Sequence, residues 1–159
     1  MEKESRWKVF LVSFIIVIVV AFIGSIFISP SVNSNWYLSH KPSITPPNYI
    51  FPIAWSILFL LIALSLSFAW LKADNQAKKK IAIIFGINFA LNILWSIFFF
   101  GLQNPTLAFI DLILLWISIL LMIFTVCKIY RPSSYMLIPY LLWVSFAGAL
   151  NYLFMSRNF

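Results

Sequence analysis

The polar side chains that could do chemistry in this sequence lie within long apolar segments. Asn88 and Asn92 are four residues apart and Trp95 follows three residues later, so a helix would carry all three on one face. Asp111 is the only acidic or basic residue within these segments. With no Lys or Arg there as a counter-ion, its carboxyl group is protonated, hydrogen-bonded to a neighbour such as Asn92 or an indole, or wetted by a cavity. A hydrogen-bonding contact between helices is the simpler interpretation.

Aromatic side chains follow helical spacing in two further segments. Trp55 and Phe59 are four residues apart within residues 50–71. Within residues 135–155, Pro139 predicts a bend. One helical face follows it and carries Tyr140, Trp143, Ala147, Leu150 and Asn151. These faces predict an aromatic interior between helices.

Other kinds of chemistry have few candidate residues. The single cysteine, Cys127, excludes an internal disulfide framework and a site built from several cysteines. We find no nucleophile with a matching base and no cluster of metal ligands, so the sequence does not support ordinary hydrolytic chemistry. We therefore expect no metal site.

The elements that hold these residues must be membrane-spanning helices. Hydrophobic residues make up 63% of the 159 residues and charged residues only 9%, which is far more apolar surface than a soluble domain of this length can bury. Five segments are long enough to cross a bilayer, and lipid requires each to be a helix. They are residues 9–29, 50–71, 81–101, 107–127 and 135–155. We predict an all-α integral membrane protein in which residues 1–159 form one five-helix bundle with a cytoplasmic N-terminus.

The cationic residues predict the orientation of the bundle. Nine of the eleven Lys and Arg residues fall on one side: Lys3, Arg6, Lys8, Lys72, Lys78, Lys79, Lys80, Lys128 and Arg131. The positive-inside rule makes that side cytoplasmic, so the first loop, residues 30–49, is extracytoplasmic. The net charge of +7 is therefore mainly a topology signal, and we expect no nucleic-acid partner. We predict that the protein is a multi-pass protein of a bacterial cell membrane.

The aromatic and polar side chains share one depth in this arrangement. A rise of about 1.5 Å per residue puts them roughly 6 to 12 Å below the outer ends of their helices. The set is Trp55, Trp95, Asp111 and Ala147. Directly above lies the proline-rich stretch Trp36–Pro47. We predict an aromatic pocket in the outer half of the bundle, covered by this loop as a lid.

A second face of residues 81–101 carries small side chains. Ala82, Gly86 and Ala90 repeat every four residues, which allows close approach of another helix. A homodimer through this face is one interpretation, and packing within the monomer has nearly equal weight.

Motifs along most of the chain resemble the TspO/MBR family of tryptophan-rich sensory proteins and translocator proteins, also called peripheral benzodiazepine receptors. The matching residues run in the family's order from about residue 20 to 157. They are Trp36-Tyr37, Lys41-Pro42-Ser43, Pro46-Pro47, Trp55, Leu91-Asn92, Trp95, Phe99-Phe100-Gly101, Ala108, Asp111, Pro139-Tyr140-Leu141, Trp143, Phe146-Ala147 and Leu150-Asn151-Tyr152.

The resemblance implies a bundle, usually dimeric, that binds protoporphyrin IX, haem and benzodiazepine-type ligands without a required cofactor. The ligand-binding residues it implies are Tyr37, Pro46, Trp55, Phe59, Asn92, Trp95, Asp111, Trp143, Ala147 and Leu150, of which Tyr37 and Pro46 come from the family alone. A membrane receptor or carrier for tetrapyrroles is the leading hypothesis. The alternative is an enzyme that degrades protoporphyrin IX with light and oxygen, for which the family points to Trp55 and Trp143. A transporter would need a continuous polar path, and the inner halves of the segments are too apolar for one.

Two details qualify the resemblance. Ile44 stands where the family usually has a second lid tryptophan, so that contact is lost. A cholesterol-recognition pattern is present as Leu150, Tyr152 and Arg157, but such patterns are weak and we do not expect sterol binding. His40 is interpreted as a surface residue of the loop, with an axial contact to haem iron as the alternative.

Overall fold

The computed structural model of the protein describes residues 5–157, and Lys3 lies outside this range. The elements in chain order are α1 (Arg6–Ser31), α2 (Asn35–His40), α3 (Ile50–Lys72), α4 (Asn75–Ser96), the π-helical turn η1 (Ile97–Gly101), α5 (Pro105–Cys127), α6 (Arg131–Tyr135) and α7 (Ile138–Ser156). Within residues 5–157 five helical stretches are long and apolar enough to cross a membrane. The prediction of an all-α, five-span membrane protein is confirmed.

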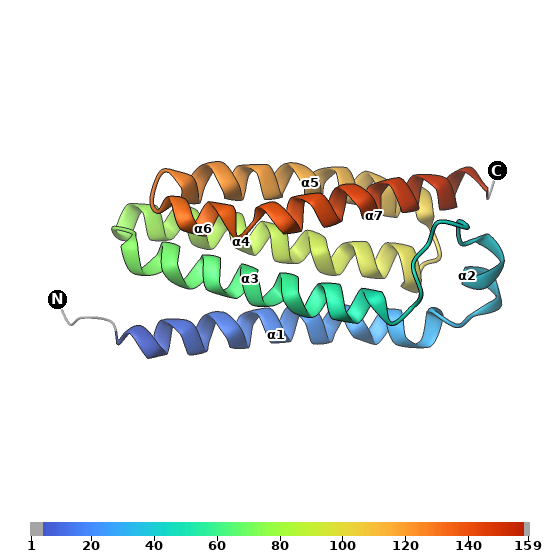
Figure 1. Cartoon of the computed structure of the whole chain (residues 1–159), viewed down its shortest axis with the longest axis horizontal. Helices are drawn as coiled ribbons and strands as arrows, with labels where there is room; N and C mark the ends of the chain where they lie inside the picture. The colour runs from blue at the N-terminus through green and yellow to red at the C-terminus, as the bar shows by residue number, and fades with distance from the viewer. Residues whose placement is uncertain (1–4, 158–159) are drawn as a thin grey trace.

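The long helices run side by side, with α2 capping one end of the bundle (Figure 1). The N-terminus of α1 lies at the opposite end, together with the connections α3–α4 and α5–α6. We call the α2 end the outer end and the other the inner end. The first four predicted spans lie inside α1, α3, α4 with η1, and α5, and the fifth runs from the last residue of α6 across a short turn into α7. The connection between α3 and α4 is shorter than expected, because the Asp74 side chain accepts a hydrogen bond from Ala77 N and starts α4 ahead of the lysines.

The interior of the bundle is apolar, with a few hydrogen bonds that join helices. Ile62, Phe85 and Ile119 are among the side chains fully buried between α3, α4 and α5. Ser65 Oγ on α3 donates to the Ser133 carbonyl oxygen on α6, 2.8 Å away. Such bonds satisfy polar groups that lipid could not, so they fix how neighbouring helices align.

The predicted lid loop contains a helix that sequence reasoning missed. α2 spans six residues, and the Ser34 side chain caps its N-terminus by accepting from Tyr37 N at 3.2 Å. Ser34 before Asn35 and Trp36 is a common N-terminal cap of a helix. The prolines that follow are typical of a loop, so the sequence predicts a loop here. The segment of residues 30–49, which we call the lid, is therefore a helical turn followed by an irregular stretch.

Two local irregularities shape the outer and inner ends. At η1, Leu102 N donates to Ile97 O at 2.8 Å, the spacing of a π-helix, and Gln103 then takes a left-handed φ of 49° to end the element. The fifth predicted span is divided into α6 and α7. Pro139 lies in the first turn of α7, so it starts that helix rather than bending it.

Candidate functional site

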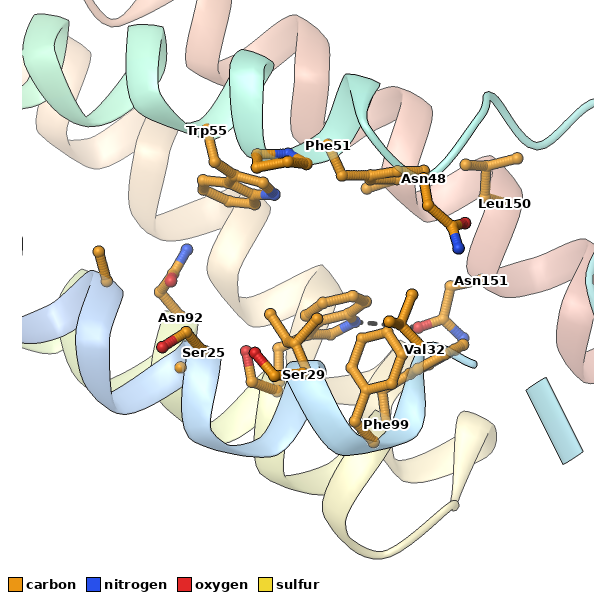
Figure 2. A pocket seen from close by; sticks show the side chains of 18 of the residues that line it. Ser25, Ser29, Val32, Asn48, Phe51, Trp55, Asn92, Phe99, Leu150 and Asn151 are labelled. Atoms are coloured by element: carbon orange, nitrogen blue, oxygen red, sulfur yellow. Dashed lines mark hydrogen bonds between the residues drawn. The ribbon is translucent and has the colours of Figure 1, made fainter. Parts of the chain in front are cut away.

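A cavity of about 450 Å³ lies in the outer half of the bundle, between α1, α3, α4, α7 and the lid. We call it the aromatic pocket. Phe51 and Trp55 of α3 lie on one side of it, and Ser25 and Ser29 of α1 lie on the other (Figure 2). Its volume is in the range of pockets that bury a small organic ligand.

Seven of the ten predicted binding residues line this pocket. They are Tyr37, Trp55, Phe59, Asn92, Trp95, Ala147 and Leu150. They come from the lid and three helices, so segments far apart in sequence converge at the predicted depth. The remaining three, Pro46, Asp111 and Trp143, are not among the lining residues that the structure describes.

Two of these three adjoin lining residues, and the third is buried on α5. Trp143 packs edge-on against Phe51, with ring centroids 5.9 Å apart, so it supports a lining residue instead of contacting the cavity. Pro46 is half-buried in the lid next to the lining Thr45. Asp111 is 4% exposed and turned into the bundle.

The expected partners of Asp111 are engaged elsewhere. Asn92 Nδ2 donates to Tyr140 Oη at 3.3 Å, and the Trp95 indole N–H donates to Asn151 Oδ1 at 3.1 Å. The Asp111 Oδ2 atom is buried and has no hydrogen-bond partner within residues 5–157. Of the alternatives for Asp111, a hydrogen bond from Asn92 or an indole is therefore not the one found among residues 5–157, because Asn92 and Trp95 bond side chains of α7 instead.

The polar side chains of α4 are held in place by neighbouring helices. Tyr140 Oη donates to Asn88 Oδ1 at 3.2 Å, while Asn88 Nδ2 donates to Ser118 Oγ at 2.8 Å. Asn151 Nδ2 donates to the Pro105 carbonyl oxygen at 2.9 Å. These bonds fix the rotamers of Asn92 and Trp95 at the pocket wall, so the pocket is preformed.

An aromatic cluster holds the lid against α7 and η1. The Phe154 ring centroid lies 4.9 Å from that of Trp36 and 5.9 Å from that of Tyr37, which it stacks on at 20°. Tyr37 also meets Phe100 at 5.7 Å. Tyr37 is 6% exposed, and burial raises the pKa of its phenol above the usual value. The lid is thus a packed part of the bundle.

The whole α1 wall of the pocket was missed by sequence reasoning. It is formed by Val20, Ala21, Gly24, Ser25, Ile28 and Ser29, with Val32 just past the end of the helix. A signal was present, because Ala21, Ser25 and Ser29 put small residues at four-residue spacing in an otherwise bulky segment. A Cβ built on Gly24 would lie 3.4 Å from Ser96 Oγ, so α1 and α4 are close here.

The lining chemistry favours binding through stacking and neutral hydrogen bonds. The lining residues described by the structure include no Lys, Arg, His, Asp, Glu, Cys or Met. Aromatic rings dominate, with hydroxyl and carboxamide groups between them. The His40 ring lies outside the pocket, with Nδ1 2.8 Å from the Trp36 carbonyl oxygen. Such a wall suits a flat, largely apolar molecule.

The small-residue face of α4 lies on the outside of the monomer. Ala82, Gly86 and Ala90 are all exposed, and a Cβ built on Gly86 would have no neighbour within 4 Å. A groove beside it, lined in part by Ala82, Gly86 and Trp70, runs between α1, α3 and α4. Gly86 therefore has open space beside it in the monomer.

The fold and pocket define a five-helix membrane protein with an aromatic cavity under a lid. The profile of the TspO/MBR family matches residues 13–156, and the chain belongs to this family. A protein of Archaeoglobus fulgidus named tryptophan-rich protein TspO is 42% identical over 146 residues, 88% of this chain and 90% of the relative. One of the same name from Chlorobaculum tepidum is 37% identical over 145 residues, 87% of this chain and 89% of the relative. The translocator protein of Bos taurus is 29% identical over 127 residues, 78% and 75% of the two chains.

Proposed function

We propose that the protein is a membrane receptor or carrier that binds tetrapyrroles in the aromatic pocket. The observation that carries the proposal is the 450 Å³ cavity with indole and phenyl walls beneath a packed lid. A porphyrin macrocycle is flat and apolar, so stacking on Trp55, Trp95 and Phe99 buries its faces. Benzodiazepine-type molecules are also flat and aromatic, and we propose that they compete for the same pocket.

Metal-free protoporphyrin IX fits this wall better than haem. Haem proteins hold iron through His, Cys, Met or Tyr side chains. Among the lining residues that the structure describes, only Tyr37 is of such a type, and its ring is stacked on Phe154. Haem would therefore be held by its macrocycle, with no strong iron ligand.

Titration of purified protein with protoporphyrin IX, followed by porphyrin absorbance, tests the proposal. Replacing Trp55 by Ala removes a stacking surface and should weaken binding by about tenfold, equivalent to about 1.4 kcal/mol. Trp116→Ala is the matched control, because Trp116 lies outside the pocket and bonds Ser145 Oγ. Equal affinity of the wild type and Trp55→Ala would defeat the assigned site.

The competing function is degradation of protoporphyrin IX by light and oxygen. It is favoured by the Trp55 indole, which lies on the pocket wall next to any bound porphyrin. Illuminating the complex in air should then yield a new absorbance band that is absent with Trp55→Phe. Bleaching equal to that of porphyrin in empty detergent would leave the protein as a binder only.

We also propose that the lid faces away from the cytoplasm. Eight described Lys and Arg residues lie at the inner end, while Lys41 and Arg157 lie at the outer end. In a Cys127→Ser background, Ser43→Cys in the exposed part of the lid should react with an impermeant maleimide in intact cells. Labelling only after cell lysis would reverse the orientation.

A homodimer through Ala82, Gly86 and Ala90 is proposed from their exposure. A second helix could approach Gly86 closely because no side chain of the monomer covers it. Gly86→Ile should abolish the cross-linked dimer in detergent, whereas Ala149→Ile, at an exposed position on α7, should not. A cross-linking yield unchanged by Gly86→Ile would exclude this interface.

A further inference from the structure

Four small residues line the aromatic pocket and are also exposed on the side of the bundle. Ser25 and Ser29 belong to α1, and Pro52 and Ser56 belong to α3. Other side-facing positions of these helices carry large apolar residues, such as Ile26, Ile53 and Ile57 at 53%, 55% and 55% exposure. We call these four residues the side opening.

The two halves of the side opening lie at matching depths. α1 ends at Ser31 and α3 begins at Ile50, both at the outer end. At about 1.5 Å per residue, Ser25 and Ser56 each lie about 9 Å below those helix ends. Ser29 and Pro52 each lie about 3 Å below them. The residues therefore lie at two matching levels below the outer helix ends. The deeper level, Ser25 and Ser56, falls at the depth of the hydrocarbon core, since the helices exceed its thickness of about 30 Å by only a few ångström at each end.

Two of the hydroxyl groups at the side opening bond their own helix. Ser25 Oγ donates to the Phe22 carbonyl oxygen at 2.7 Å, and Ser56 Oγ donates to the Pro52 carbonyl oxygen at 2.7 Å. A serine that bonds its own helix in this way can face lipid at little cost. The opening is thus small, uncharged and compatible with an apolar molecule moving past it.

The outer end above the pocket is closed by several contacts. The lid packs on Phe154 through Trp36 and Tyr37. Arg157 Nη1 also donates to the Lys41 carbonyl oxygen at 3.2 Å, which ties the lid to the end of α7. Passage through the lid requires these contacts to break, whereas the side opening between α1 and α3 is bordered by small, exposed side chains.

We propose that the ligand of the aromatic pocket, a molecule whose flat apolar ring system partitions into the bilayer, enters and leaves through the side opening between α1 and α3. This inference deepens the proposed function, since it assigns the route to the same pocket. It also defines the ligand class, because a molecule that uses this route must insert its ring system into the bilayer before it binds. The lid then serves as a fixed roof.

The test measures access to the pocket without any porphyrin. Ser96, a buried pocket residue on α4, is changed to Cys in a Cys127→Ser background and labelled with a membrane-soluble pyrene maleimide in lipid nanodiscs. The plugged variant, Ser25→Phe/Ser56→Phe, should label about tenfold more slowly. Ser56→Leu, a smaller plug with less risk to folding, should show intermediate slowing.

The matched control is Ile26→Phe/Ile57→Phe, which alters exposed neighbours that do not line the pocket. It should label at the unplugged rate, and so should Arg157→Ala, which loosens the lid. Equal labelling rates for the plugged and control variants would overturn the proposal. Faster labelling with Arg157→Ala, combined with no slowing in the plugged variants, would also overturn it, because it would place the route at the lid. A wild type that binds no protoporphyrin IX would defeat the proposed function alone, because the labelling rates still report the route.

Discussion

Replacing Tyr140 by Phe tests the hydrogen bonds that align α4 with α7. The Tyr140 hydroxyl is fully buried, donates to Asn88 Oδ1 at 3.2 Å and accepts from Asn92 Nδ2 at 3.3 Å. The ring itself fits its site, so the substitution removes one oxygen and leaves the packing in place. The two asparagines then keep only their other contacts, such as the bond from Asn88 Nδ2 to Ser118 Oγ.

The expected loss follows from the number and burial of these bonds. Hydrogen bonds between membrane helices contribute about 0.6 kcal/mol each on average. A buried acceptor left without a donor adds about 1 kcal/mol or more. Asn88 is 0% exposed, so no solvent replaces the lost donor. We expect Tyr140→Phe to lower the free energy of unfolding by about 2 kcal/mol.

Reversible unfolding in mixed micelles with increasing sodium dodecyl sulfate measures this difference. Tyr152→Phe is the control, because Tyr152 is 52% exposed and its removal of a hydroxyl group should change the free energy of unfolding little. A Tyr140→Phe protein as stable as the Tyr152→Phe protein would refute the idea that this network aligns the helices.

Three further changes test other contacts. Burial raises the pKa of the Tyr37 phenol, so the unfolded chain releases that proton first and stability should fall as the pH rises above about 10. The thermal stability of Tyr37→Phe should therefore decrease less than that of the wild type as the pH rises above about 10. Gly148→Leu should lower the midpoint of thermal unfolding, because a Cβ there already lies 3.1 Å from Leu112 Cδ2 and overpacking costs about 1 to 3 kcal/mol. Asp74→Ala removes the cap on Ala77 N, 2.7 Å away, and should reduce the free energy of unfolding by about 1 kcal/mol.

Each of these three has a contrary outcome. Identical alkaline stability curves for the wild type and Tyr37→Phe would mean that the phenol does not contribute to the pH dependence. An unchanged midpoint for Gly148→Leu would mean that α5 and α7 separate easily at this position. Asp74→Asn retains a capping oxygen, so its free energy of unfolding should be close to that of the wild type. A Ser or Asn at position 74 that behaves like Ala would contradict the capping role.

The number and type of the membrane-spanning elements could be predicted from the apolar composition of the chain. A bilayer leaves each long apolar segment no stable form but a helix, so five helices could be predicted before any contact was known. Spacing also identified the α4 and α7 walls, since Asn92, Trp95, Ala147 and Leu150 share faces that helical geometry fixes.

The remaining features depend on how each helix is rotated about its axis and on which side chains of other helices it meets, and the sequence of one segment does not determine either. The α1 wall was missed because its helix is apolar on all sides, and only packing decides which face meets the cavity. Trp143 was expected at the pocket but lies behind Phe51, a residue on another helix. A hydrogen bond from Asn92 was one alternative for Asp111, but the Asn92 amide donates to Tyr140 on α7. The start of α2 was signalled by Ser34 but obscured by the prolines after it.

Filling the aromatic pocket from α7 tests the central claim most directly. Ala147 lines the cavity, whereas Ala149 is exposed on the same helix and does not line it. Folded Ala147→Phe and Ala149→Phe proteins, titrated with protoporphyrin IX in the same nanodiscs, should therefore differ in affinity. Ala147→Phe should weaken binding by at least about tenfold, while Ala149→Phe should bind like the wild type. Wild-type affinity in Ala147→Phe would contradict binding in this pocket.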